Sequence, residues 1–227
     1  MNIALIVFAG KGERISSSVP KQFIKVKGKD LVGYTIETFN NHPLIDEIIL
    51  VTSTDFLAYT KNLVFNSRFL KVSNVVEGGK TRQESVKNGL NFVNFKENDN
   101  ILIHDGDRPL VSDSIITRCI KGLDNYDALM VAIRSSQALK EVENLGMKYF
   151  DNDIAYDVQT PQCFKFGLIK NTHNQLSDKS FNDDASMVME LGHEVKIIEG
   201  DKYNFKVTTN KDLDFFIKIV SELKSED

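Results

Sequence analysis

Two glycines and two cationic residues follow the first apolar run of the chain. The run is Asn2–Phe8, and residues 9–14 (AGKGER) come directly after it. Glycines after a buried strand let the backbone approach a ligand closely, so that its amides can surround phosphate oxygens. Arg14 and Lys21 add positive charge, which phosphoryl and nucleotidyl transfer both need where negative charge develops. The segment predicts a phosphate site, although the same residues would suit a tight turn with solvated side chains.

An aspartate stands at the end of another predicted strand. Asn100–His104 is a short apolar run, and Asp105 follows it in the sequence HDGDRP. In open α/β sheets, ligands bind outside the carboxyl ends of the strands. A carboxylate there can hold Mg²⁺ while nucleotide phosphates and water complete the octahedron. Asp105 is therefore the candidate metal ligand; the alternative is a carboxylate that caps a turn. His104 is expected to be a partly buried neighbour rather than a ligand.

Three further segments gain meaning only in combination with these two. Gly79 and Ser85 lie where a strand passes into a helix, which places backbone amides near a ligand but also suits an ordinary turn. Asp183 and Asp184 suit a helix N-terminus, because the helix dipole favours acids there. Lys206, taken alone, would be a surface lysine on a short strand.

Alternating strand and helix patterns must position these residues. Buried strands are predicted at residues 2–8, 46–53, 71–77, 100–104 and 128–133, because these short runs are rich in β-branched residues. Apolar spacing predicts helices at 31–39, 84–92, 112–123 and 212–223. This alternation predicts an α/β fold with a mostly parallel sheet and flanking helices. Residues 135–151 break the rhythm and predict a β-hairpin, and short strands are expected at 194–198 and 205–208.

Composition limits the classes of function. A chain of 227 residues suits one α/β domain, and a net charge of −4 argues against broad nucleic-acid binding. Cys119 and Cys163 lie in no metal or redox motif, which favours buried free thiols in a reducing compartment. No apolar run approaches the roughly 18 residues that span a membrane. The expected location is the cytoplasm, with no membrane partner.

Taken in order, these segments resemble the cytidylyltransferases of the 2-C-methyl-D-erythritol 4-phosphate and ribitol-5-phosphate type. No single motif is decisive, but seven in register are highly specific, and they cover residue 4 to about residue 215. The matching pieces are Ala9-Gly10-x-Gly12-x-Arg14, Pro20-Lys21-Gln22, Gly79-x-x-Arg82-x-x-Ser85-Val86, His104-Asp105-x-x-Arg108-Pro109, Gln159-Thr160-Pro161-Gln162, Asp183-Asp184-Ala185-Ser186 and Lys206-Val207-Thr208.

The resemblance implies one Rossmann-like nucleotidyltransferase domain over residues 1–227, with a projecting β-arm at about 135–151 that mediates a homodimer. It implies that CTP and a polyol phosphate react with Mg²⁺, giving a CDP derivative and pyrophosphate without a covalent enzyme intermediate. The implied catalytic residues are Arg14, Lys21 and Lys206. The implied nucleotide-binding residues are Ala9, Gly10, Gly12, Gly79, Lys80 and Ser85. Asp105 is the implied metal ligand, and the acceptor would lie against Asp105, Arg108 and Ser136.

Differences from the family pattern concern the acceptor half. Members often have Asp-Thr where this chain has Ser135-Ser136, an arginine at the position of Asn152, and an acidic residue at Lys80. The acceptor is therefore left open between ribitol 5-phosphate, for wall or capsule polymers, and 2-C-methyl-D-erythritol 4-phosphate, for isoprenoid precursors. Two other functions stay open: a related nucleotidyltransferase acting on another sugar or alditol phosphate, and a non-catalytic nucleotide-binding relative.

Overall fold

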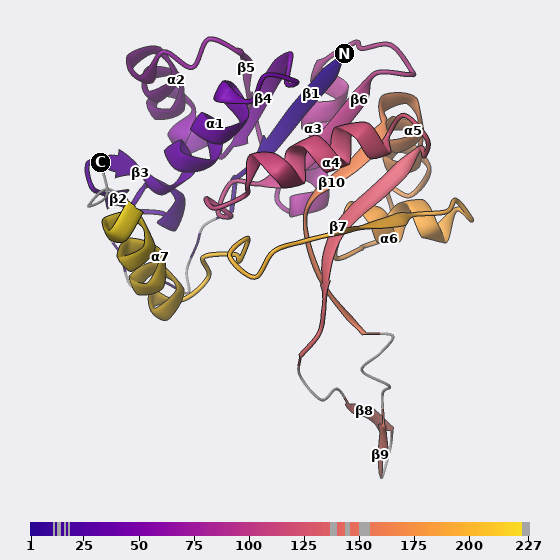
Figure 1. Ribbon diagram of the computed structural model, residues 1–227. Helices are drawn as coiled ribbons and strands as arrows, with labels where there is room; N and C mark the ends of the chain where they lie inside the picture. Colours follow the sequence, from indigo (N-terminus) through magenta and orange to yellow (C-terminus); the bar gives the residue numbers. More distant parts are fainter. Residues whose placement is uncertain are drawn as a thin grey trace.

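A seven-stranded sheet forms the centre of the molecule (Figure 1). The computed structural model describes residues 1–10, 12, 15, 17, 19–136, 140–143, 146–149 and 155–223. Across the sheet the strands run β11 (Lys196–Glu199), β7 (Ala128–Arg134), β10 (Tyr156–Lys165), β6 (Asn100–Asp105), β1 (Asn2–Val7), β4 (Glu47–Thr52) and β5 (Val72–Glu77). β10 is antiparallel to both of its neighbours, whereas the other pairs are parallel. The predicted α/β fold with a mostly parallel sheet is confirmed.

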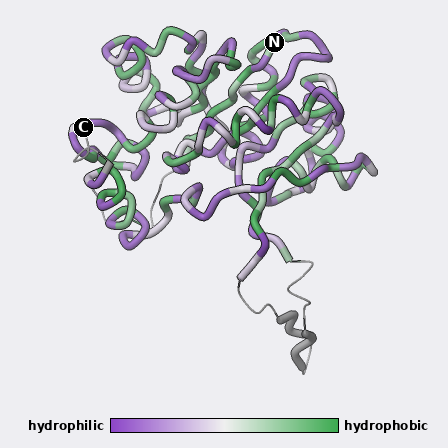
Figure 2. Tube along the Cα trace, viewed as in Figure 1, coloured by the Kyte–Doolittle hydropathy of each residue, from purple (hydrophilic) through white to green (hydrophobic). Residues whose placement is uncertain are grey.

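Helices cover both faces of this sheet. α1 (Leu31–Asn41), α2 (Leu57–Ser67) and α4 (Asp113–Gly122) pack on one face, and α3 (Arg82–Phe92), α5 (Phe166–Gln175) and α6 (Asp184–Glu190) pack on the other. The strands supply both cores by alternation: in β1, Ala4 and Ile6 join the first core, and Ile3, Leu5 and Val7 join the second. Figure 2 shows the resulting hydrophobic colour along the central strands.

A third, smaller core lies at the carboxyl-terminal end of the chain. Phe216 and Val220 of α7 (Asn210–Leu223) pack with Leu31, Val207 and Val26. Val26 belongs to a short hairpin of β2 (Lys25–Val26) and β3 (Lys29–Asp30), which follows the 3₁₀ turn η1 (Lys21–Phe23). This packing brings η1, near the start of the chain, close to Lys206 near its end.

Several elements escaped the sequence patterns, among them β10, α2 and α5, and one predicted element is wrong. β10 contains Pro161, which argues against a central strand; the structure accommodates it at a shift of register between Val158 and Gln162. α2 buries only Thr60 fully, so it has little apolar periodicity. Residues 205–208 were predicted as a strand but form none, and the amide of Val207 donates to the carbonyl of Asp107 instead.

The predicted hairpin within residues 135–151 is confirmed in its described part. β8 (Lys140–Glu143) pairs antiparallel with β9 (Gly146–Tyr149), with Lys140 opposite Tyr149. Figure 1 shows the hairpin below the body of the molecule, beyond the ends of β7 and β10. Within the described ranges, no helix is long and apolar enough to cross a membrane.

Candidate active site

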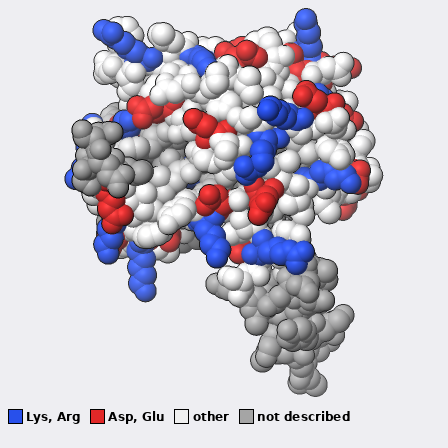
Figure 3. Space-filling view, in the orientation of Figure 1, with Lys and Arg blue, Asp and Glu red and all other residues white. Residues whose placement is uncertain are grey.

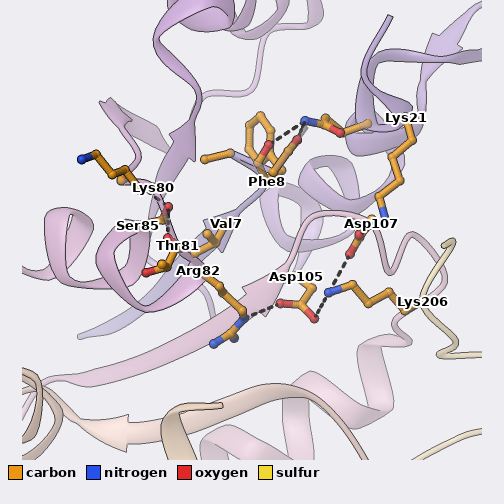
Figure 4. A pocket seen from close by; sticks show the side chains of 14 residues that line it. Val7, Phe8, Lys21, Lys80, Thr81, Arg82, Ser85, Asp105, Asp107 and Lys206 are labelled. Atoms are coloured by element: carbon orange, nitrogen blue, oxygen red, sulfur yellow. Dashed lines mark hydrogen bonds and ion pairs between the residues drawn. The ribbon is translucent and has the colours of Figure 1, made fainter. Parts of the chain in front are cut away.

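Two adjoining cavities open at the carboxyl ends of β1 and β6. The first has a volume of about 160 Å³ and the second about 210 Å³. Arg82, Asp105 and Lys206 line both, so these three side chains stand at the boundary between them. Figure 4 shows the side chains of the first cavity, which come from loops far apart in the sequence. Its lining residues are Val7, Phe8, Ala9, Gly10, Lys21, Gln22, Gly79, Lys80, Thr81, Arg82, Ser85, Asp105, Asp107 and Lys206.

The loop after β1 is held by a buried glutamine. The Gln22 side-chain amide donates hydrogen bonds of 2.8 Å each to the carbonyls of Phe8 and Gly10. Phe23 anchors the same turn, because its ring stacks on Phe56 with centroids 4.4 Å apart. The neighbours of Gly10 leave the space around its α-carbon open. The backbone at Gly10 is therefore accessible to a ligand, and Gln22 fixes where it lies.

The loop between β5 and α3 closes the opposite wall. Ser85 accepts a hydrogen bond from the amide of Gly79 at 3.0 Å and donates one to the carbonyl of Thr81 at 2.8 Å. A β-carbon on Gly78 would lie 2.4 Å from the β-carbon of Ala9, so only glycine lets the two loops come this close. The prediction that this segment begins a helix is confirmed: Thr81 is the N-cap of α3.

Asp105 is the centre of a cluster of cations. Its carboxylate accepts from Arg82 Nε at 2.9 Å and from Lys206 Nζ at 3.0 Å, and Arg108 Nε lies 3.6 Å away. Burial alone would raise the pKa of Asp105, but Arg82, Lys206 and Arg108 outweigh it and hold the pKa well below its ordinary value. Asp105 is therefore ionised at neutral pH, and Lys206 is part of this cluster rather than a solvated surface lysine.

A buried ion-pair network supports Arg82 from behind. Arg82 Nη1 donates to Asp184 Oδ2 at 2.7 Å, and Asp184 Oδ1 accepts from His173 Nε2 at 2.9 Å. Asp184 and His173 are each 1% exposed. The predicted helix start is also confirmed here, since Asp183 caps α6 by accepting from the amide of Ser186. Asp184 thus fixes the guanidinium that faces both cavities.

A second carboxylate pairs with Lys21. Lys21 Nζ lies 2.5 Å from Asp107 Oδ2 and donates to the carbonyl of Val207 at 2.7 Å. Lys206 Nζ lies 3.7 Å from Asp107 Oδ1. Figure 4 shows the two lysines approaching Asp107, with Asp105 on the far side of Lys206. The first cavity therefore places two ammonium groups and two carboxylates within one small volume.

The comparisons with known proteins agree with this geometry. The family model described as 2-C-methyl-D-erythritol 4-phosphate cytidylyltransferase matches residues 2–221. The chain belongs to this family. It is 40% identical over 229 residues to the cytidylyltransferase of that name from Clostridium novyi, covering 99% of this chain and 98% of the relative. It is 34% identical to the one from Thermotoga neapolitana, with 98% of each chain covered.

A solved structure of a relative has the same fold. The crystal structure of 4-diphosphocytidyl-2C-methyl-D-erythritol synthase from Anaerococcus prevotii matches with a TM-score of 0.85 and 27% identity, covering 97% of this chain and 96% of that one. The predicted resemblance to the cytidylyltransferases is thereby confirmed. The chain is a nucleotidyltransferase of this family, with the family's mostly parallel sheet.

Most residues predicted for the cytidylyltransferase site lie around these cavities. Eight of them line the first: Ala9, Gly10, Lys21, Gly79, Lys80, Ser85, Asp105 and Lys206. Arg108 lines the second. Gly12 lies behind Lys21, where an added β-carbon would be 2.9 Å from Lys21 Cγ. Ser136 lines neither cavity within this chain, so its assignment stays a prediction, and Arg14 and Asn152 lie outside the described residues.

Arg82 and Asp107 were not predicted as site residues, although each stood inside a recognised motif. Arg82 occupies the arginine position of the Gly79-x-x-Arg82 piece, and Asp107 lies two residues after the candidate metal ligand. The available signal for Arg82 was its place on the first turn of a helix that follows a glycine pair. What it contacts, namely Asp105 and Asp184, depends on the order of strands in the sheet.

His104 fixes the backbone of Asp105 from inside the core. The amide of Asp105 donates to Thr160 Oγ1 at 3.1 Å, and Thr160 Oγ1 lies 2.9 Å from His104 Nδ1. His104 Nε2 lies 3.2 Å from the carbonyl of Arg108. A neutral ring that accepts at Nδ1 and donates at Nε2 satisfies all three groups. His104 is fully buried, more so than the sequence predicted, and it lines neither of these two cavities.

The pH dependence of stability should report this buried histidine. Burial lowers the pKa of His104 from 6.5 to about 4. As the pH falls, the unfolded chain takes up the proton first, so stability is lost between pH 6.5 and 4, by about 3 kcal/mol in all. Urea unfolding measures the free energy of unfolding of wild type and of His104→Gln. The difference in favour of wild type should decrease as the pH falls through this range. The exposed His193→Gln is the control, and a constant difference for His104→Gln would contradict the assignment.

Proposed function

We propose that this chain transfers the cytidylyl group of CTP to 2-C-methyl-D-erythritol 4-phosphate, releasing pyrophosphate. The observation that carries the proposal is the cation cluster around Asp105, at the boundary between two cavities. Family membership and the names of the relatives favour this acceptor over ribitol 5-phosphate. The intact set of Lys21, Arg82 and Lys206 argues against a non-catalytic relative, because transfer at phosphorus depends mainly on positioned positive charge.

The nucleotide would occupy the first cavity. Its cytosine and ribose would contact the walls formed by Ala9, Gly10, Gly79 and Ser85, with Lys80 at the rim. Its triphosphate would extend toward Lys21 and Lys206, whose ammonium groups stabilise negative charge on the α-phosphate and the leaving pyrophosphate. Arg14 is proposed as a further cation there, on the strength of its motif alone.

The acceptor would occupy the second cavity, beside Arg108. Arg82 Nη2 and Arg108 Nε are buried donors with no hydrogen-bond partner among the described residues, and both side chains line this cavity. A phosphate oxygen of the acceptor would satisfy donors of this kind. That oxygen would attack the α-phosphorus of CTP in line, forming a new P–O bond while the bond to the β-phosphate breaks. No enzyme group is consumed, so no covalent intermediate is needed.

Asp105 has the chemistry of a Mg²⁺ ligand. Mg²⁺ in nucleotide enzymes is bound through one or two carboxylates plus substrate phosphates and water. The described residues contain no group of three or more His, Cys, Asp or Glu placed to hold a metal, so Asp105 would share the ion with the phosphates. An ion held there would neutralise charge on the phosphates. Asp105 would then hold the ion while Arg82 and Lys206 turn toward the substrates.

A homodimer through the β-arm is part of the same proposal. A groove of about 750 Å³ lies beside the edge strand β11, and the exposed side chains of Tyr156, Ile197 and Tyr203 line it. It adjoins the base of the arm, where Tyr156 pairs with Arg134. The arm of a second copy would fill this groove. Sedimentation should give twice the chain mass of 25.7 kDa, and a monomer at assay concentrations would contradict the proposal.

The buried free thiols favour the cytoplasm as the location of the protein. Cys119 and Cys163 are both fully buried and form no disulfide, as the sequence predicted. Free thiols persist in a reducing compartment. Figure 3 shows acidic and basic side chains interspersed on one face of the molecule, without a continuous basic surface there. This distribution supports small phosphorylated substrates rather than nucleic acid.

Pyrophosphate release tests the proposed reaction. CTP and Mg²⁺ are supplied with 2-C-methyl-D-erythritol 4-phosphate or with ribitol 5-phosphate, in parallel and with ATP, GTP or UTP as alternative donors. The expected result is rapid release only with CTP and the methylerythritol acceptor. Rapid release with ribitol 5-phosphate instead would replace the acceptor, and release with another nucleotide would replace the donor. No release with any pair would favour a non-catalytic role.

A further inference from the structure

Asp107 places a negative charge where the proposed reaction needs positive charge. Its carboxylate lines the first cavity and contacts both lysines assigned to the triphosphate: Lys21 at 2.5 Å and Lys206 at 3.7 Å. The side chains of Lys21 and Asp107 are only 10% and 13% exposed. Solvent therefore screens this pair weakly, and its charges act at close range on anything bound in the cavity.

Backbone hydrogen bonds fix the position of Asp107. Its carbonyl accepts from the amide of Val207 at 2.8 Å, and the carbonyl of Val207 accepts from Lys21 at 2.7 Å. Asp107, Lys21 and the backbone of Val207 are thus joined by hydrogen bonds and an ion pair. Lys21 already gives two of its three N–H donors to Asp107 and Val207, so a phosphate must take the third or displace the carboxylate.

The charged residues of the first cavity indicate how Asp107 changes its affinity for a polyphosphate. Among its described lining residues, Lys21, Lys80, Arg82 and Lys206 are positive, and Asp105 and Asp107 are negative. Asp105 has a proposed task as a metal ligand, whereas Asp107 has none. Removing the charge of Asp107 would strengthen the attraction for any polyphosphate. Since pyrophosphate must leave after every turnover, a cavity with too much positive charge would hold its own product.

We infer that Asp107 is an internal counter-ion of the lysines Lys21 and Lys206, which weakens the binding of pyrophosphate and so permits its release. The inference rests on the proposed function, because it takes the first cavity as the polyphosphate site. Asp107 acts on pyrophosphate only through its contacts with these two lysines. It contributes no bond to the reaction itself.

Binding of pyrophosphate to Asp107→Asn tests the inference. Asparagine keeps the shape and can still accept from Lys21, but it removes the charge. Calorimetry without divalent cations should show that the variant binds pyrophosphate at least about tenfold more tightly than wild type does. The difference in Kd should become smaller as KCl is added. In turnover, pyrophosphate should inhibit the variant at correspondingly lower concentrations. Asp107→Glu, which keeps the charge, should bind like wild type.

The control is Asp124→Asn, which makes the same charge change at an exposed turn outside both cavities. Equal or weaker binding by Asp107→Asn, or an equal gain in Asp124→Asn, would overturn the inference. Thermal unfolding of each variant shows whether it is folded, and Asp107→Ala serves as a second uncharged variant. Wild-type turnover separates the two proposals: if wild type transfers no cytidylyl group, the proposed function fails, whatever the binding data show.

Discussion

Replacing Lys21 by alanine should lower kcat by about two to three orders of magnitude, which is the usual cost of removing one positioned donor at a developing charge. Lys21 Nζ faces the first cavity between Asp107 and the carbonyl of Val207. Lys206 also approaches Asp107, at 3.7 Å, but it hydrogen-bonds to Asp105 and so should not replace Lys21. A steady-state assay with saturating CTP measures the effect. The exposed Lys61→Ala, on α2, is the control for loss of a positive charge.

Stability must be separated from catalysis in this variant. Lys21→Ala leaves the mostly buried carboxylate of Asp107 without its closest partner, which typically costs about 3–5 kcal/mol of unfolding free energy. The double variant Lys21→Ala/Asp107→Ala removes both charges, so it should regain much of that stability. It should not regain activity, because the ammonium group is still missing. Recovery of activity together with stability would contradict a direct catalytic role for Lys21.

Replacing Asp105 by asparagine should be nearly as damaging to turnover. The change keeps the shape of the side chain but removes the charge that Arg82, Lys206 and Arg108 surround. If Asp105 holds Mg²⁺, kcat should fall by about a hundredfold or more, and the Mg²⁺ concentration for half-maximal rate should rise. Both are read from one titration of Mg²⁺ against initial rate.

A matched control distinguishes loss of a ligand from loss of a buried ion pair. Asp99 is also a buried carboxylate, paired with the N-terminal ammonium group at 2.8 Å, but it lies outside both cavities. Asp99→Asn should lower stability without changing the Mg²⁺ dependence. An Asp105→Asn enzyme that needs no more Mg²⁺ than wild type would remove Asp105 from the metal site.

The sequence predicted the parts of this site that follow from strand ends and glycines. Gly10, Gly79 and Asp105 each lie within two residues of the end of a predicted strand, and the carboxyl ends of parallel strands meet at one edge of a sheet. Lys21 and Lys206 were predicted through their motifs. Lys21 and Lys206 are 185 positions apart in the sequence. They lie close together because α7 packs against the residues around η1.

What the sequence could not predict depends on pairing between distant segments. Arg82 lies 102 residues from Asp184, and neither motif states that they touch. The ion pair between Asp107 and Lys21 joins residues 86 positions apart, and no local pattern predicts it. β10 escaped because Pro161 is unusual in a central strand, and its register shift became visible only with its neighbours present. Local patterns gave the elements, whereas tertiary contacts decided which charges meet.

The most direct test of the central claim is a competition in one reaction. Wild-type protein is mixed with CTP, Mg²⁺ and equal amounts of 2-C-methyl-D-erythritol 4-phosphate and ribitol 5-phosphate, and the products are identified by mass spectrometry. The expected products are CDP-methylerythritol and pyrophosphate in equal amounts, with little CDP-ribitol. CDP-ribitol as the main product, or no CDP product from either acceptor, would contradict the proposed function.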